Sequence, residues 1–226
     1  MSSPALLAVA HGSRDPAAAE VVRGLARQVR RLAPVLDVRV AFLDHAEPSL
    51  PAELTAAGAN TVIVPLLLSS GYHLAADIGG VADVAGARVA GPLGPDELLL
   101  TALTARLAEA EVPDGTPVVL AAAGSSDPLA AADVRKQAVL LAERLGVPVV
   151  AAFATAAEPN VPAAVADLRA RTGKPVAVAS YLLAPGRFAD QFADSGADWM
   201  TAPLGGHPAL AGLVIERYRR AMLAKG

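Results

Sequence analysis

The sequence predicts an α/β protein built from two similar halves, each with a parallel sheet of the flavodoxin-like or Rossmann-like kind. Short apolar runs rich in Val, Leu and Ala alternate along the chain with longer helical segments, as buried parallel strands alternate with crossover helices. The pattern of the first half also returns, in the same order, 111 to 115 positions later. An ordered repeat of this length indicates duplication of one α/β unit.

In the first half, four apolar runs read as strands covered on both faces, because they show little alternation of polar and apolar residues. Pro16 suits the first turn of a helix, which Ser13 or Asp15 can cap. The strands are expected at Ala5–Ala10, Val38–Leu43, Thr61–Leu68 and Ala87–Gly91, and the helices at Pro16–Leu32, Ser49–Ala57, Leu74–Val84 and Pro95–Ala110.

The second half follows a linker rich in proline and glycine at residues 111–117. Its opening segment, Val118–Pro128, matches Leu6–Pro16 but has Ala123 in place of His11. The predicted domains are therefore residues 1–112, which carry the reactive side chains, and residues 113–226, which have lost them. Strands of the second half are expected at Val118–Ala122, Val147–Phe153, Val176–Leu183 and Asp198–Ala202.

Composition excludes several classes of function. The 226 residues are 54% hydrophobic and include no cysteine, which rules out disulfides and thiolate metal sites. A formal charge of −3 argues against a general nucleic-acid binder. The amino terminus lacks the basic start of a signal peptide, and no uncharged run reaches the roughly 18–20 residues of a membrane span. A cytoplasmic protein without nucleic-acid or membrane partners, monomeric or homodimeric, is expected.

Candidate metal ligands follow three successive strands. His11 comes directly after the first strand, Asp44 and Glu47 after the second, and His73 after the third. Carboxyl ends of neighbouring parallel strands meet at one edge of a sheet, where open α/β sheets place their sites. Two imidazoles and a carboxylate suit a divalent ion such as Co²⁺, Fe²⁺, Ni²⁺ or Zn²⁺ and leave coordination positions open. Either histidine can also accept protons near neutral pH.

Some of these residues also have a purely structural interpretation. His45 is expected to be a bystander, because strand alternation would turn it away from Asp44. His207, before the last helix, is expected to be structural. Asp44 and Glu47 can instead cap the following helix, and Gly12-Ser13 forms either a tight turn or an anion site at a helix start.

The second half has no equivalent of this donor set. Ala123, Thr155 and Phe188 stand at the repeat positions of His11, Asp44 and His73. Polar groups and an apolar ring remain there, and they suit contact with an organic ligand rather than a metal. These candidate substrate contacts are Ser125, Ser126, Arg187 and Phe188.

Three segments together resemble the sirohydrochlorin chelatases. They are Ala10–Asp15, the Phe42–Ser49 segment and Val64–Ile78. These class II chelatases insert Co²⁺ or Fe²⁺ into a precorrin-2-derived macrocycle without ATP, and longer members consist of two fused halves. The resemblance covers the whole chain. It implies a lyase that takes the divalent metal (Co²⁺, Fe²⁺ or Ni²⁺) as substrate and needs no organic cofactor.

The resemblance also implies roles for individual residues. His11 and His73 would bind the metal and take part in catalysis, since insertion requires removal of two pyrrole protons. The family commonly has glutamate after Phe-Leu where this chain has Asp44, so either Asp44 or Glu47 completes the metal site. The substrate's carboxylates and ring would meet the remaining candidates, which are Ser13, Arg14, Ser125, Ser126 and Arg187 as donors and Tyr72 and Phe188 as apolar walls.

Two other functions fit parts of the pattern. A non-catalytic carrier of metal or tetrapyrrole could use the same site, and turnover separates it from an enzyme. A histidine phosphoesterase would also place a histidine at a strand end, but that chemistry typically has arginine just before the histidine, where this chain has Ala10. The sequence leaves open whether the product serves siroheme or cobalamin biosynthesis.

Overall fold

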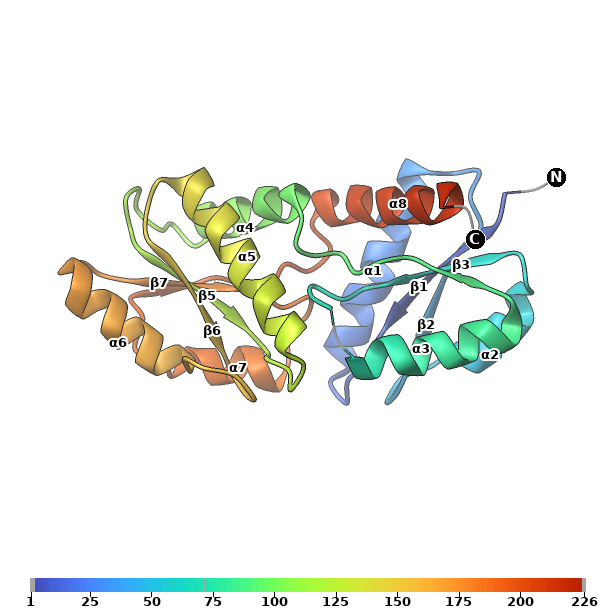
Figure 1. The fold of residues 1–226 in the computed structure, drawn as a ribbon. Coiled ribbons are helices and arrows are strands. Elements are labelled where there is room, and N and C mark those ends of the chain that lie inside the picture. Colours follow the sequence, from blue (N-terminus) through green and yellow to red (C-terminus); the bar gives the residue numbers. More distant parts are fainter. Residues whose placement is uncertain (1–2, 71, 225–226) are drawn as a thin grey trace. The chain divides into compact units, whose positions relative to one another are not determined.

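Two four-stranded parallel sheets, each covered by helices on both faces, make up the computed structural model (Figure 1). The structure describes the backbone of residues 3–70 and 72–224 and the side chains of residues 3–70 and 78–224. The strand orders are β2-β1-β3-β4 and β6-β5-β7-β8. Both orders confirm the predicted doubly wound α/β class, in which the first strand of each half lies at the centre of its sheet.

The elements of the first sheet and its helices follow the predicted sequence of strands and helices. They are β1 (Ala5–Ala10), α1 (Pro16–Leu32), β2 (Val38–Phe42), α2 (Leu50–Ala57), β3 (Thr61–Pro65), α3 (Tyr72–Ala85), β4 (Arg88–Val89) and α8 (Pro208–Leu223). The second sheet repeats this plan with α4 (Glu97–Glu109), β5 (Val118–Ala122), α5 (Pro128–Leu145), β6 (Val149–Phe153), α6 (Val161–Thr172), β7 (Ala177–Ser180), α7 (Arg187–Ala193) and β8 (Trp199–Met200).

Both sheets have fully buried central strands. Every residue of β1 and of β5 is buried, because helices cover both faces and leave no side of these strands to water. On one face of the first sheet, β1 and β3 pack against α2 and α3 through Leu7, Leu54, Ile63 and Ile78. Burying aliphatic side chains of this kind stabilises the fold by about 1.5–3 kcal/mol each.

The compact units do not coincide with the sequence repeat. One unit comprises Met1–Leu93 with Gly206–Gly226, and the other comprises Gly94–Gly205. The last helix of each half thus packs with the other half's sheet: α8 lies on α1 and β3, whereas α4 lies on α5 and β7. Compared with the predicted boundary at residue 112, α4 belongs to the second unit and α8 to the first.

Equivalent arginines hold the exchanged helices. In the first unit, the buried guanidinium of Arg217 on α8 donates to the carbonyl oxygens of Pro92 (2.6 Å) and Leu93 (2.8 Å). In the second unit, Arg106 on α4 donates to the carbonyl oxygen of Leu204 at 2.9 Å. Each helix is therefore hydrogen-bonded to the segment that follows the last strand of the sheet on which it packs.

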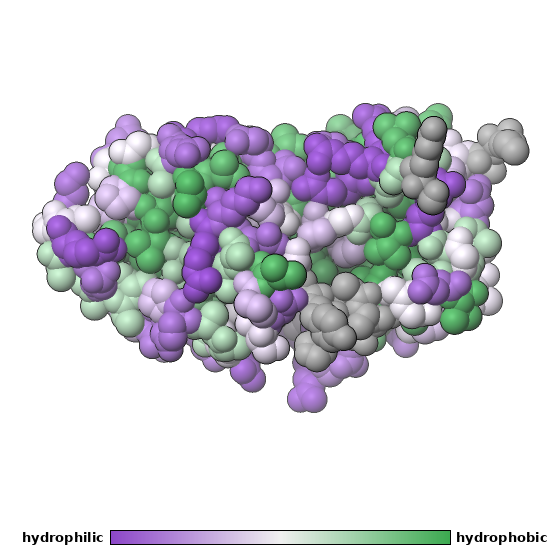
Figure 2. Space-filling model, viewed as in Figure 1, coloured by the Kyte–Doolittle hydropathy of each residue, from purple (hydrophilic) through white to green (hydrophobic). Residues whose placement is uncertain are grey.

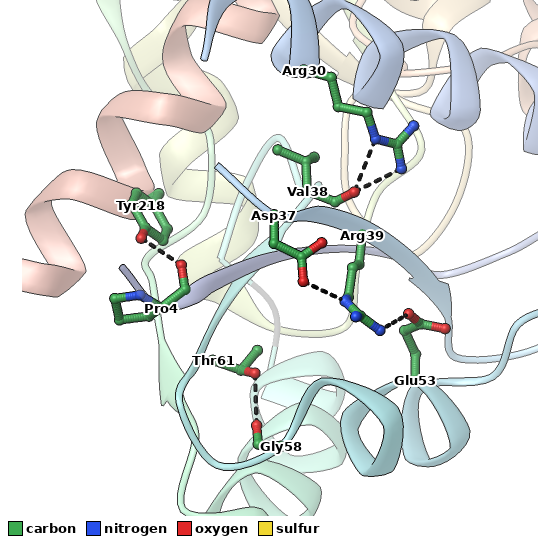
Figure 3. A network of polar contacts seen from close by, with 9 residues as sticks. All are labelled: Pro4, Arg30, Asp37, Val38, Arg39, Glu53, Gly58, Thr61 and Tyr218. Carbon is green, nitrogen blue, oxygen red and sulfur yellow. Dashed lines mark hydrogen bonds and ion pairs between the residues drawn. The ribbon is translucent and has the colours of Figure 1, made fainter. Parts of the chain in front are cut away.

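The amino-terminal edge of the first sheet is held by polar contacts (Figure 3). Arg39 binds both Asp37 (2.9 Å) and Glu53 (3.0 Å), and these hydrogen bonds hold its pKa above the usual value. Tyr218 of α8 donates to the carbonyl oxygen of Pro4 at 2.7 Å. These contacts stabilise the edge opposite the strands' carboxyl ends.

The second sheet has a comparable polar contact in which a carboxylate is favoured in its ionised form. Asp198 accepts a hydrogen bond from the backbone N–H of Val176 at 2.8 Å and binds Arg169 at 2.6 Å. First the Val176 bond and then the Arg169 bond lower the pKa of the Asp198 carboxyl below its ordinary value. The carboxylate therefore binds its proton more weakly in the folded chain than in the unfolded one.

We expect Asp198→Asn to unfold at lower urea concentration than the unaltered chain at pH 7. This difference should shrink as the pH falls below 3.8, the ordinary pKa of an aspartate carboxyl. Protonation of Asp198 then weakens the contacts that the substitution by asparagine weakens. Urea midpoints followed by circular dichroism between pH 7 and acid test this, with Asp114→Asn in the exposed linker as the control. A pH-independent difference would contradict it.

None of the helices described is long and apolar enough to cross a membrane. On the face that Figure 2 shows, hydrophilic and hydrophobic residues are interspersed over both units.

Candidate metal centre at the carboxyl edge of the first sheet

The structure brings His11 and Asp44 together beyond the ends of two neighbouring strands. The ladder between β1 and β2 continues past both strands: the N–H of Leu43 donates to Ala10 (3.1 Å), and that of Asp44 donates to His11 (2.9 Å). Both His11 and Asp44 are exposed. An imidazole and a carboxylate therefore stand on adjacent backbones at the edge where parallel sheets place their sites.

Gly12 allows this close approach. Its backbone has a φ of +96°, and a Cβ atom placed on it would lie 1.7 Å from the carbonyl oxygen of Asp44. The second unit has the same arrangement, since a Cβ atom on Gly124 would lie 1.9 Å from the carbonyl oxygen of Thr155. Only glycine fits at either position, because it adopts positive φ readily and carries no side chain.

His45 contacts Asp44, contrary to the sequence prediction. The backbone N–H of His45 donates to Oδ1 of Asp44 at 2.8 Å, and Nε2 of the imidazole lies 3.2 Å from Oδ2. The expectation that His45 turns away from Asp44 was wrong, because β2 ends at Phe42 and the alternation of a strand does not continue into the loop. His45 instead has a φ of +61°, which is uncommon for a residue other than glycine.

Glu47 is occupied in building the same loop. Its carboxylate accepts a hydrogen bond from the N–H of Ser49 at 2.9 Å, and its carbonyl oxygen accepts one from Arg23 at 3.1 Å. The second unit repeats both contacts with Glu158, Asn160 and Arg135, at 2.9 and 3.1 Å. A carboxylate kept in the unit that lacks the histidines has a role in the loop that does not depend on a metal.

The third predicted strand is shorter than expected, which changes the place of His73. β3 ends at Pro65 rather than Leu68. Beyond it, the N–H of Leu66 still donates to Val9 of β1 (2.7 Å), and the carbonyl oxygen of Leu67 accepts the N–H of Leu93 (2.7 Å). His73 thus belongs to the first turn of α3. The side chains of His73 and Tyr72 lie outside the described residues.

Among the side chains that the structure describes, no three histidine, aspartate or glutamate groups gather closely enough to hold a metal ion. A full set of two imidazoles and a carboxylate needs His73 as well.

The other candidates lie in loops and helix starts of their own units. Ser13 and Ser125 occupy equivalent places, where each hydroxyl oxygen accepts the N–H of the aspartate that caps the following helix, at 3.1 Å. Arg14 and Ser126 are exposed next to them. At the start of α7, the guanidinium of Arg187 lies 5.4 Å from the ring centroid of Phe188.

The structural expectation for His207 is confirmed: its Nδ1 accepts the N–H of Ala209 at 3.2 Å and caps α8. Sequence reasoning missed Arg23 and Arg135, which lie over the rings of Phe42 and Phe153 at 5.7 and 5.4 Å. The sequence contains a signal for this pair, because the two arginines stand at the same offset as His11 and Ala123.

Comparison with known families adds evidence that covers nearly the whole chain. The model of the family described as CbiX matches twice, at residues 5–110 and at residues 117–221. The chain belongs to the CbiX family. The paired matches agree with the internal repeat, and the family confirms the resemblance to sirohydrochlorin chelatases.

Individual relatives of this CbiX-family chain agree with that assignment. It is 28% identical over 236 residues to the sirohydrochlorin ferrochelatase of Bacillus subtilis, covering 95% of this chain and 90% of that protein. A sirohydrochlorin cobaltochelatase of Methanosarcina barkeri is 32% identical over 123 residues, covering 46% of this chain and 95% of the relative. The solved structure of SirB from Bacillus subtilis with Fe³⁺ superposes with a TM-score of 0.82 at 26% identity, covering 97% and 95% of the two chains.

Proposed function

We propose that the chain is a sirohydrochlorin chelatase, a lyase that inserts Co²⁺ or Fe²⁺, taken up as a substrate, into the tetrapyrrole. The observation that carries this proposal is His11 beside Asp44 at the carboxyl edge of the first sheet. The chain's membership of the CbiX family supports it. The named relatives comprise a ferrochelatase and a cobaltochelatase, which supports a divalent first-row metal without selecting one.

The metal donors in this proposal are His11, His73 and Asp44. Asp44 is preferred to Glu47 because the Glu47 carboxylate accepts the Ser49 N–H, and Glu158 repeats that contact in the unit without histidines. Two imidazoles and one carboxylate suit Co²⁺, Fe²⁺ or Ni²⁺ and leave positions open for pyrrole nitrogens. The exposure of His11 and Asp44 lets the ion and a large macrocycle approach.

Insertion also requires that two pyrrole N–H protons leave as the metal enters. Histidine is suited to accept them, because its ordinary pKa lies near neutral pH. The exposed Arg14 and Arg187 are proposed to bind the carboxylates of the substrate, since guanidinium groups pair with carboxylates through two parallel hydrogen bonds. Ser13, Ser125, Ser126, Tyr72 and Phe188 complete the proposed substrate contacts.

An anaerobic absorbance assay with sirohydrochlorin and Co²⁺, Fe²⁺ or Ni²⁺ tests the function. A chelatase should give many turnovers per chain, faster than spontaneous insertion, without ATP. Tight binding of the metal or tetrapyrrole with no more than stoichiometric product would identify a carrier instead. The ratio of rates for the three metals, measured under the same conditions, would rank them as substrates.

A further inference from the structure

His45 holds both oxygens of the Asp44 carboxylate. The backbone N–H donates to Oδ1 at 2.8 Å, and the imidazole Nε2 lies 3.2 Å from Oδ2. The Asp44 side chain is 60% exposed, whereas that of His45 is 35% exposed. The less exposed imidazole of His45 thus contacts the more exposed carboxylate of Asp44, whose backbone N–H donates to His11.

The second unit shows that the loop does not need this imidazole. Ala156, at the repeat position of His45, has a φ of +60° against +61° for His45. The N–H of Phe42 donates to Pro48 at 2.9 Å, and that of Phe153 donates to Pro159 at 3.0 Å. Alanine therefore supports the same backbone. The imidazole is present only in the unit that also has a carboxylate, Asp44, at the position equivalent to Thr155.

We propose that His45 is a positioning residue, which orients the Asp44 carboxylate toward the metal substrate and thereby raises the affinity of the site. The inference rests on the proposed function, in which Asp44 is a metal donor. Carboxylates that bind metals are generally held by a hydrogen-bonding neighbour, and removing such a neighbour typically weakens metal binding about 10- to 100-fold. His45 acts through Asp44 and takes no coordination position itself.

Co²⁺ binding to four full-length chains tests this role: the unaltered chain, His45→Ala, Asp44→Ala and the double variant. Calorimetry gives the dissociation constants, and the visible absorption of bound Co²⁺ reports its donor set. We expect His45→Ala to weaken binding about 10- to 100-fold when Asp44 is present, and to have little further effect in the Asp44→Ala background. His45→Gln, which keeps an N–H donor of similar reach, should restore part of the loss.

Ala156→His is the matched control, because it adds an imidazole on the same backbone next to Thr155 and should leave Co²⁺ binding unchanged. An unchanged dissociation constant in His45→Ala would overturn the proposal. Equal losses of Co²⁺ affinity with and without Asp44 would also overturn it, since His45 would then act independently of Asp44. Absence of Co²⁺ binding to the unaltered chain would overturn it as well.

Turnover with sirohydrochlorin separates this inference from the proposed function. Co²⁺ binding that depends on His45 only when Asp44 is present, without any turnover, would support the positioning role and reject the chelatase. Turnover by a chain in which His45→Ala weakens Co²⁺ binding equally with and without Asp44 would support the chelatase and reject the positioning role.

Discussion

Replacing His11 by alanine is expected to lower the rate of metal insertion at least about 100-fold, because loss of a mere neighbour of a metal ligand already costs 10- to 100-fold in affinity or activity. His73→Ala should have a comparable effect if the two imidazoles act together. His11 is exposed, so its removal should change the free energy of unfolding by no more than about 0.5 kcal/mol. Initial rates with sirohydrochlorin and Co²⁺, together with urea unfolding, measure both quantities.

The second unit provides the control for His11. Thr155→Ala alters the equivalent edge of the sheet that has Ala123 instead of a histidine, and it should leave Co²⁺ binding unchanged. Insertion at the unaltered rate by a folded His11→Ala chain would remove the proposed metal centre. A fall in rate that only accompanies unfolding would mean that His11 is structural.

Gly12→Ala is expected to destabilise the chain by about 2–4 kcal/mol and to abolish Co²⁺ binding. The added Cβ would lie 1.7 Å from the carbonyl oxygen of Asp44, and that atom belongs to the backbone, so the whole loop must move. Alanine at a φ of +96° adds strain of its own, of the order of 1–3 kcal/mol. Displacing the loop separates Asp44 from His11, which is the pairing the metal centre depends on.

Gly124→Ala separates the two consequences. The contact with Thr155 is nearly as short, 1.9 Å, so the loss of stability should be similar, yet the loop that it displaces carries neither Asp44 nor His45. Chemical unfolding should therefore show comparable losses for the two variants, while calorimetry at a temperature where both are folded shows Co²⁺ binding only for Gly124→Ala. Retained binding in a folded Gly12→Ala chain would contradict the proposed donor pair.

Much of the fold is predictable from the sequence because the relevant signals are local. The apolar runs at β1 and β5 indicate buried parallel strands, and the prolines at the starts of α1 and α5 mark where these helices begin. The internal repeat adds a comparison that few chains offer. The second copy has Ala123 where the first has His11, and this difference directs attention to His11. The order β2-β1-β3 confirms that β1, which precedes His11, lies between the strands that precede Asp44 and His73.

The candidate site is less predictable where the backbone leaves regular structure. Strand periodicity predicts that the side chains of His45 and Asp44 point apart. In the structure His45 has a positive φ, and its imidazole contacts the Asp44 carboxylate. The apolar run continues to Leu68, yet β3 ends at Pro65, and the carbonyl oxygen of Leu67 pairs with Leu93, which is distant in sequence. Neither feature has a periodic signal, because each is decided by hydrogen bonds within a loop or between segments far apart in the chain.

The sequence by itself determined the α/β class, the duplication and the half in which the reactive histidines remain. Only the tertiary structure decided that α4 and α8 are exchanged between the units. A helix of either half presents a similar apolar face, so local pattern cannot tell which sheet it covers. The choice depends on long-range contacts, such as those of Arg217 with Pro92 and Leu93 and of Tyr218 with Pro4, which form only when the whole chain has folded.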